Sequence, residues 1–165
     1  MVFLMNLVGY VFDWKYISVL ATIEEVNDFE VQNKLLKDTF EEVGVSTPEA
    51  AAMVWSDGLK ERSAALQYAV MSKELKEEYE EQLKLSAPNW VTGISSPWVE
   101  GVKIIRMDEV EKDCYIIKLL FTTATSVGPF AEYKAVLTIN REGEFWRITK
   151  IKQDQELYVY TRFSS

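Results

Sequence analysis

The sequence predicts an α+β fold in which N-terminal helices pack on a curved antiparallel sheet, giving a cone-shaped domain. Two observations predict it. Apolar residues recur at helical spacing up to about residue 85, and the alternation typical of strands replaces that spacing from residue 98 onward. Because the helices come first and the strands follow, we expect the helices to lie together on one face of the sheet.

Length and composition are those of one globular domain. The chain has 165 residues, of which 48% are apolar and 27% charged, and a chain of this length can bury roughly 70% of its unfolded surface. The formal net charge of −8 opposes phosphate backbones and anionic lipid, so nucleic-acid binding is not expected. We divide the chain into an apolar N-terminal segment, residues 1–26, and a single α+β domain, residues 27–165.

The role of the apolar segment is left open by its sequence. Asp13 and Lys15 offset the gain of inserting its apolar residues into a bilayer. No basic region precedes the apolar stretch, and only Ala21 offers a cleavage site, so a signal peptide is not expected. This indicates a cytoplasmic location but leaves the location open. We expect the segment to pack on the domain or on a partner chain, with membrane contact as the less favoured alternative.

Helices are predicted between residues 28 and 85, each with a recognisable start. The first covers residues 28–43, where apolar residues recur at helical spacing. Thr47 precedes a proline and a glutamate and can cap the second helix. Ser63 and Ser72 can cap two further helices, the last of which has an acidic outer face.

The helical half ends at the break Ser86-Ala87-Pro88-Asn89, and strands follow. A polar turn over residues 108–113 is expected between the first two strands. Within 132–140, apolar and polar residues alternate, so one side of that strand is solvated or shared. The predicted strands are 98–107, 114–125, 132–140, 145–152 and an edge strand over 157–163.

Histidine is absent, and Cys114 is the only cysteine. These counts exclude Ser–His and Cys–His nucleophile pairs and histidine-containing zinc sites. The glutamates between residues 77 and 81 lie along a predicted helix and lack the loop spacing of a calcium site, so they are interpreted as a solvated face. No metal or cofactor is expected, and Cys114 is expected to be a small core residue.

Several motifs resemble small bacterial domains of the nuclear-transport-factor-like, cystatin-like superfamily. The resemblance covers residues 46–152, and its most specific part is Asn89-Trp90-Val91-Thr92-Gly93 followed by Ser95-Ser96-Pro97-Trp98-Val99-Glu100. Domains of this kind occur in Gram-positive bacteria, alone or attached to membrane-bound zinc proteases, which suggests an extracytoplasmic location. The protease's zinc motif is absent from this chain. The resemblance implies a cone with a pocket between the helices and the concave sheet.

Candidate ligand-binding residues surround the most specific motif. Aromatic side chains beside a few hydroxyl groups are typical of a site for an apolar or sugar-like ligand. Trp55 and Trp98 are expected in the core, although Trp98 is also a candidate, whereas Trp90 is expected to be more exposed. The ligand-binding candidates are Tyr68, Trp90, Thr92, Ser95, Ser96 and Trp98.

An enzyme would need an acid or a base in the pocket, and without histidine only carboxylates and tyrosines are candidates. A carboxylate beside tyrosines in an apolar cavity can act as a general base for an isomerase or a hydratase. The same carboxylates also suit solvent-facing strand positions. The candidates are Glu100, Asp113, Glu132, Tyr115 and Tyr133.

We therefore expect a non-catalytic module that binds a protein partner or a small ligand in the cone pocket, with the small isomerase- or hydratase-type enzyme as the alternative. Residues 115–121 are largely apolar on both faces of their strand, and such a strand needs cover on both sides. A two-fold homodimer is expected for this reason, burying the sheet, the N-terminal segment or both.

Overall fold

The computed structural model describes residues 31–32, 34–35, 38–39 and 42–164. Contacts divide the chain into two units, residues 1–39 and 40–165. In the first unit the described residues are helical, which agrees with the helix expected over 28–43. The expected start of that helix at Asp28, and the apolar segment 1–26, lie outside the described residues.

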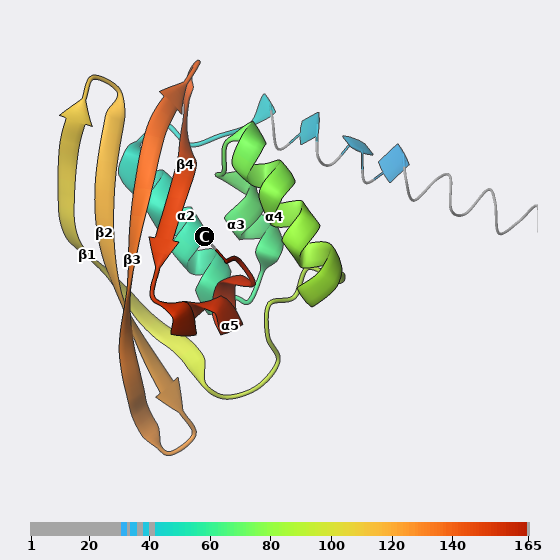
Figure 1. The fold of residues 1–165 in the computed structure, drawn as a ribbon, viewed down its shortest axis with the longest axis vertical. Coiled ribbons are helices and arrows are strands. Elements are labelled where there is room, and N and C mark those ends of the chain that lie inside the picture. Colours follow the sequence, from blue (N-terminus) through green and yellow to red (C-terminus); the bar gives the residue numbers. More distant parts are fainter. Residues whose placement is uncertain (1–30, 33, 36–37, 40–41, 165) are drawn as a thin grey trace, which may run out of the picture. The chain divides into compact units, whose positions relative to one another are not determined.

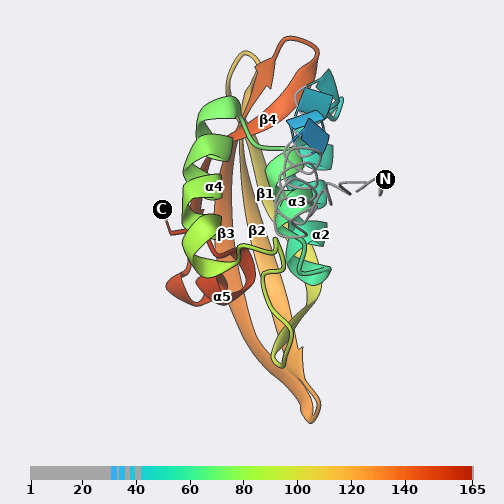
Figure 2. The ribbon, with the colours of Figure 1, turned by 90° about the vertical axis from the view of Figure 1, so that its right-hand side faces the viewer.

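The second unit is an α+β domain with its helices before its sheet, as the sequence predicts (Figure 1). The three longest helices of this unit lie on the same side of the sheet (Figure 2). Its elements are α2 (Pro48–Lys60), α3 (Ala64–Ala69), α4 (Lys73–Ser86), β1 (Trp98–Glu111), β2 (Cys114–Thr125), β3 (Gly128–Glu142), β4 (Phe145–Gln153), the short 3₁₀ helix η1 (Gln155–Leu157) and α5 (Tyr158–Thr161).

The three predicted helix caps are confirmed by hydrogen bonds. The Thr47 hydroxyl accepts from the backbone N–H of Ala50 at 3.1 Å and starts α2. The hydroxyls of Ser63 and Ser72 each accept from the N–H three residues further on, at 3.3 Å, and start α3 and α4. Each cap satisfies one of the N–H groups that a helix leaves without a partner in its first turn.

The sheet has four antiparallel strands in the order β1-β2-β3-β4. β2 has the predicted bounds, whereas β1, β3 and β4 are longer than the sequence predicts. β1 continues to Glu111, so a tight turn at Lys112 and Asp113 replaces the longer turn expected over 108–113. Alternation along β3 is confirmed. Ala135, Leu137 and Ile139 are buried on the concave face, and the residues between them face outward.

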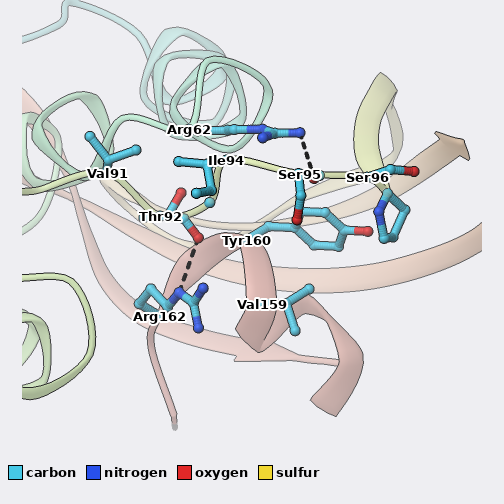
Figure 3. Close-up of a pocket in the computed structure, with 11 residues that line it drawn as sticks. Arg62, Val91, Thr92, Ile94, Ser95, Ser96, Val159, Tyr160 and Arg162 are labelled. Carbon is cyan, nitrogen blue, oxygen red and sulfur yellow. Dashed lines mark hydrogen bonds between the residues drawn. The ribbon is translucent and has the colours of Figure 1, made fainter. Parts of the chain in front are cut away.

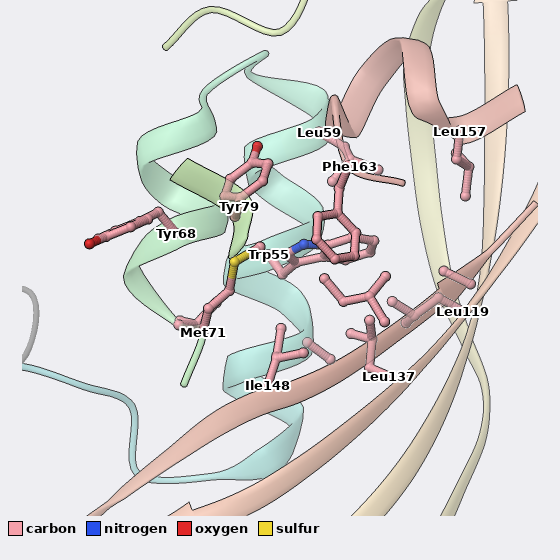
Figure 4. Close-up of a cluster of buried hydrophobic side chains, with 14 of the residues drawn as sticks. Trp55, Leu59, Tyr68, Met71, Tyr79, Leu119, Leu137, Ile148, Leu157 and Phe163 are labelled. Atoms are coloured by element: carbon pink, nitrogen blue, oxygen red, sulfur yellow. The ribbon is translucent and has the colours of Figure 1, made fainter. Parts of the chain in front are cut away.

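The core lies between the helices and the concave face of the sheet. Trp55 of α2 is fully buried and meets the ring of Phe121 edge-on, at 5.9 Å between centroids. Figure 4 shows side chains from all layers converging on this point; among them are Leu59, Tyr79, Leu119, Leu137, Ile148, Leu157 and Phe163. No helix in the described part of the chain is long and apolar enough to cross a membrane.

The edge strand predicted over 157–163 is wrong. The segment forms η1 and α5, and then returns over the core. Its buried apolar residues, Leu157, Tyr160 and Phe163, recur every three positions, which is helical spacing rather than the alternation of a strand. The tyrosines and the valine at 158–160 are typical of strands. The segment is helical instead because it packs against α4, where the ring of Phe163 contacts that of Tyr79.

Candidate functional site

The interior of the cone is filled by side chains. Residues of β2 and β3 that point toward the helices, such as Leu119 and Leu137, are fully buried in one continuous cluster with Trp55. The C-terminal turn closes the end of this cluster, because Leu157 and Phe163 pack into it. The pocket that the superfamily resemblance implied at the centre of the cone is therefore occupied by core residues.

A groove lies instead outside the core, where the segment between α4 and β1 meets α5 (Figure 3). Its volume is about 460 Å³. Eleven residues line it: Arg62, Val91, Thr92, Gly93, Ile94, Ser95, Ser96, Pro97, Val159, Tyr160 and Arg162. None of the eleven is acidic, so the two arginines set the charge of the groove.

Both arginines follow the end of a helix, and both are held by a backbone carbonyl of the loop. Arg62 and Arg162 have φ values of 57° and 58°, in the left-handed region. The Nη2 group of Arg62 donates to the carbonyl of Ser95 at 2.8 Å, and Nε of Arg162 donates to the carbonyl of Thr92 at 3.0 Å. Each guanidinium has five N–H donors, so each keeps donors for a ligand.

The third polar component of the groove is a buried hydroxyl. Thr92 is fully buried, and its Oγ1 has no hydrogen-bond partner among the described residues. Its backbone is fixed by the N–H of Thr92, which donates to the carbonyl of Arg62 at 3.0 Å. A buried hydroxyl without a partner is costly.

Tyr160 forms the wall of the groove nearest the core. It is only 5% exposed, and burial raises the pKa of its hydroxyl, with a further increase from Tyr133. A hydrogen bond with Thr123 and the positive charge of Arg62 act in the opposite direction on that pKa. Tyr160 therefore stays neutral near pH 7 and offers the groove a neutral hydroxyl, not an anion.

Half of the predicted ligand-binding residues gather in this groove. Thr92, Ser95 and Ser96 line it, whereas Trp90 and Tyr68 form a separate aromatic pair with centroids 5.2 Å apart. Trp98 begins β1 and does not line the groove. The arginines were not among the candidates, and for Arg162 no local sequence signal exists, since its contact with Thr92 spans 70 residues.

The expected division of the tryptophans is only partly correct. Trp55 is fully buried, as predicted. Trp98 is half-buried and lies outside the core cluster, whereas Trp90 is also half-buried but packs against that cluster. The reason is the contact of Trp90 with Tyr68, which turns its ring toward the helices.

The carboxylates proposed for an enzyme lie at the surface of the domain. Glu100 is exposed at a bulge of β1, and Glu132 is exposed on the outer face of β3. Asp113 occupies the turn between β1 and β2, 3.8 Å from Arg141. None of the three lines the groove.

The two tyrosines proposed with these carboxylates lie on the concave face of the sheet. Tyr115 packs edge-on against Trp146 at 5.3 Å, and a hydrogen bond with Glu109 is the main cause that raises the pKa of its hydroxyl. Tyr133 is half-buried opposite Phe121.

The expected core cysteine, Cys114, is only half-buried at the start of β2. No three described carboxylates or cysteines are close enough together to hold a metal ion.

Comparison with known proteins supports the fold. No family model matches the sequence, and no curated protein matches it. A solved structure of a protein from Thiobacillus denitrificans, described as a calcium/calmodulin-dependent protein kinase type II association domain, matches with a TM-score of 0.51 and 14% identity. The match covers 67% of this chain and 96% of that one. At this identity it shows the fold alone, which is an arrangement of helices on one face of a curved antiparallel sheet.

Proposed function

We propose that the protein is a non-catalytic binding module that holds the carboxylate or phosphate group of a small ligand in the groove between Arg62 and Arg162. The observation that carries the proposal is a groove lined by two guanidinium groups with unused donors and by no acidic residue. Guanidinium groups match the planar oxygen pairs of carboxylates and phosphates, and such charge-assisted hydrogen bonds are about twice as strong as neutral ones.

Binding is favoured over catalysis by the chemistry of the lining residues. Arginine does not lose its proton in proteins, so Arg62 and Arg162 can orient and neutralise an anion but cannot act as bases. The remaining polar groups of the groove are hydroxyls, and the sequence contains no histidine to activate them. The enzyme alternative would need a base from outside the groove.

A direct test is to follow backbone amide signals by NMR while succinate or inorganic phosphate is added at constant ionic strength. We expect the largest shifts in residues 91–97 and 160–162. Arg62→Asn and Arg162→Asn remove one guanidinium each while placing a residue that tolerates φ near +60°, and each is expected to weaken binding by about ten-fold or more.

Two controls make this result specific. Succinamide has the same shape without the charges and should not bind. Arg141→Asn removes an exposed arginine at the other end of the sheet and should leave the affinity unchanged. Binding that survives both groove substitutions, or shifts that map elsewhere, would refute the groove as the site.

Self-association is a second proposal, and it is supported by a different observation. The solved structure that matches this fold is described as an association domain, and the outer face of the sheet carries apolar residues that α2, α3 and α4 leave uncovered. The two-fold homodimer expected from the sequence is one form of such an assembly.

A further inference from the structure

The outer face of the sheet is basic, although the protein as a whole is acidic. Four cross-strand rows form this face between the turns, because residues paired directly across an antiparallel sheet point to the same side. The rows are Asp108-Ile116-Thr138-Lys150, Arg106-Lys118-Val136-Lys152, Lys103-Leu120-Lys134 and Gly101-Thr122-Glu132. We call these fourteen residues the basic face.

The charge of the basic face is opposite to that of the rest of the chain. It holds six cationic and two anionic side chains and so contributes +4, whereas the chain carries a formal −8. All other residues together therefore carry −12. Among the described residues none of the five lysines on this face has an ion-pair partner within 4.0 Å, and only Arg106 is paired, with Asp108.

The centre of the basic face is apolar. Ile116, Leu120 and Val136 lie on adjacent strands and are half-buried, with the lysines around them. An apolar centre inside a polar rim is the usual composition of a protein–protein interface. Figure 1 shows α2, α3 and α4 on the other side of the sheet, so these helices leave this centre uncovered.

Charge decides which kind of contact this face can make. A two-fold contact between two sheets places the same patch on both sides, so six cations would face six cations, and like charges across an interface oppose association. The face needs an acidic partner. A second copy of this chain presents one, because everything outside the basic face sums to −12.

The outer side of α4 is an acidic surface of the second copy. Glu74, Glu77, Glu78, Glu80 and Glu81 line one shallow surface there. Glutamates four residues apart on a helix are separated by about 6 Å along its axis, and residues two apart on a strand by about 6.6 Å. The lysine rows and the glutamate rows therefore have nearly the same repeat.

We propose that the basic face of one copy binds the acidic outer side of α4 of a second copy. This inference rests on the proposed self-association and is independent of the groove. The contact is heterologous, since it joins two different surfaces, and it leaves one basic face and one α4 surface free on each pair. Further copies can therefore add head to tail, closing a ring or extending a chain.

The test is sedimentation velocity on the full-length chain and on two charge-reversed variants. Lys118→Glu/Lys152→Glu alters one row of the basic face, and Glu74→Lys/Glu78→Lys alters α4. We expect the unaltered chain to associate at micromolar concentration in 50 mM salt and to dissociate at 500 mM salt, because the contact is between exposed charges. Each variant alone should lose at least ten-fold in association constant.

Mixing the two variants gives the sharpest result. The α4 variant keeps the native basic face and the sheet variant keeps the native α4, so an equimolar mixture should form pairs that neither variant forms alone. Two control variants, Lys60→Glu/Lys112→Glu and Glu61→Lys/Glu156→Lys, change the net charge by the same amounts at exposed positions outside both surfaces. They should associate like the unaltered chain. Circular dichroism melting curves establish that all variants fold.

Three outcomes would overturn the inference. A full-length chain that stays monomeric at low salt refutes both the self-association and its proposed form. Association that neither charge reversal weakens refutes only this form, and leaves the two-fold dimer as the explanation. Binding of an unrelated acidic peptide or of duplex DNA to the basic face of a monomeric chain assigns that face to a different partner.

Discussion

The hydroxyl group of Tyr79 connects α4 to the C-terminal turn. It donates to the backbone carbonyl of Thr161 at 2.8 Å, and the ring packs edge-on against Phe163 at 6.0 Å. Tyr79 is fully buried, and burial raises the pKa of its hydroxyl. The hydrogen bond is therefore neutral over the whole physiological range and depends on geometry, not on pH.

Replacing Tyr79 with phenylalanine keeps the ring and removes the donor. The carbonyl of Thr161 would then be buried without this partner, so Tyr79→Phe is expected to lower the free energy of unfolding by about 1–3 kcal/mol. Urea denaturation followed by circular dichroism measures this change. Tyr158→Phe, at a partly exposed position on α5, is the matched control and should have little effect. Equal stability of the two variants would contradict the role given to Tyr79.

At the scale of elements, helix starts were the most predictable features of this chain. The cap at Thr47 depends on three consecutive residues and one hydrogen bond, the one that Thr47 accepts from Ala50. Pro48 occupies the first turn, where its missing N–H costs nothing, and Glu49 lies near the positive end of the helix dipole. All of this information is local, so the sequence contains it.

Thr47→Ala removes this cap and is expected to cost about 1 kcal/mol of stability. The exposed neighbour Ser46 provides the control, because Ser46→Ala changes a hydroxyl outside the cap. Thermal denaturation of both variants compares them directly. If Thr47→Ala melts at the same temperature as the unaltered chain, the hydroxyl does not stabilise α2.

The C-terminal turn shows where local information fails. Residues 157–163 are rich in aromatic and β-branched side chains, which favour strands, yet the segment folds as η1 and α5. Gln153 on β4 binds the carbonyl of Phe163 at 2.7 Å, and the Thr161 hydroxyl at 2.8 Å. The two Gln153 bonds span only 8 and 10 residues, but the hydrogen bond from Tyr79 to the carbonyl of Thr161 spans 82 residues, so only the folded chain makes it available.

For the whole domain, the strand order determines where the backbone is best protected. β2 and β3 are central and pair with a strand on both sides, whereas β1 pairs on one side and β4 has only isolated bridges to Val45 and Met71 on its outer edge. The hairpin tip between β2 and β3 extends away from the helices (Figure 1), and Val127 there is 95% exposed. Local stability is expected to follow this arrangement.

Hydrogen exchange should therefore be slowest in residues 117–121 and 137–139, and in α2, whose side chains are buried against them. Residues 126–131 at the hairpin tip should exchange much faster, because the core does not reach them. Mass spectrometry of exchanged and digested protein measures both regions in one experiment. Comparable exchange rates in the central strands and at the tip would show that the core is not the most stable part of the domain.

The sequence alone determined the fold class, the helix caps and the alternation of β3, because helical spacing, capping residues and strand alternation are written within a few adjacent positions. It also placed Thr92, Ser95 and Ser96 among the candidate site residues. Only the tertiary structure decided that the cone is filled, that Arg62 and Arg162 line one groove, and that six cations share one face of the sheet. Each of these three features depends on residues that are tens of positions apart in the sequence. Spacing and composition do not reveal which of these residues meet, because the packing of the folded chain brings them together.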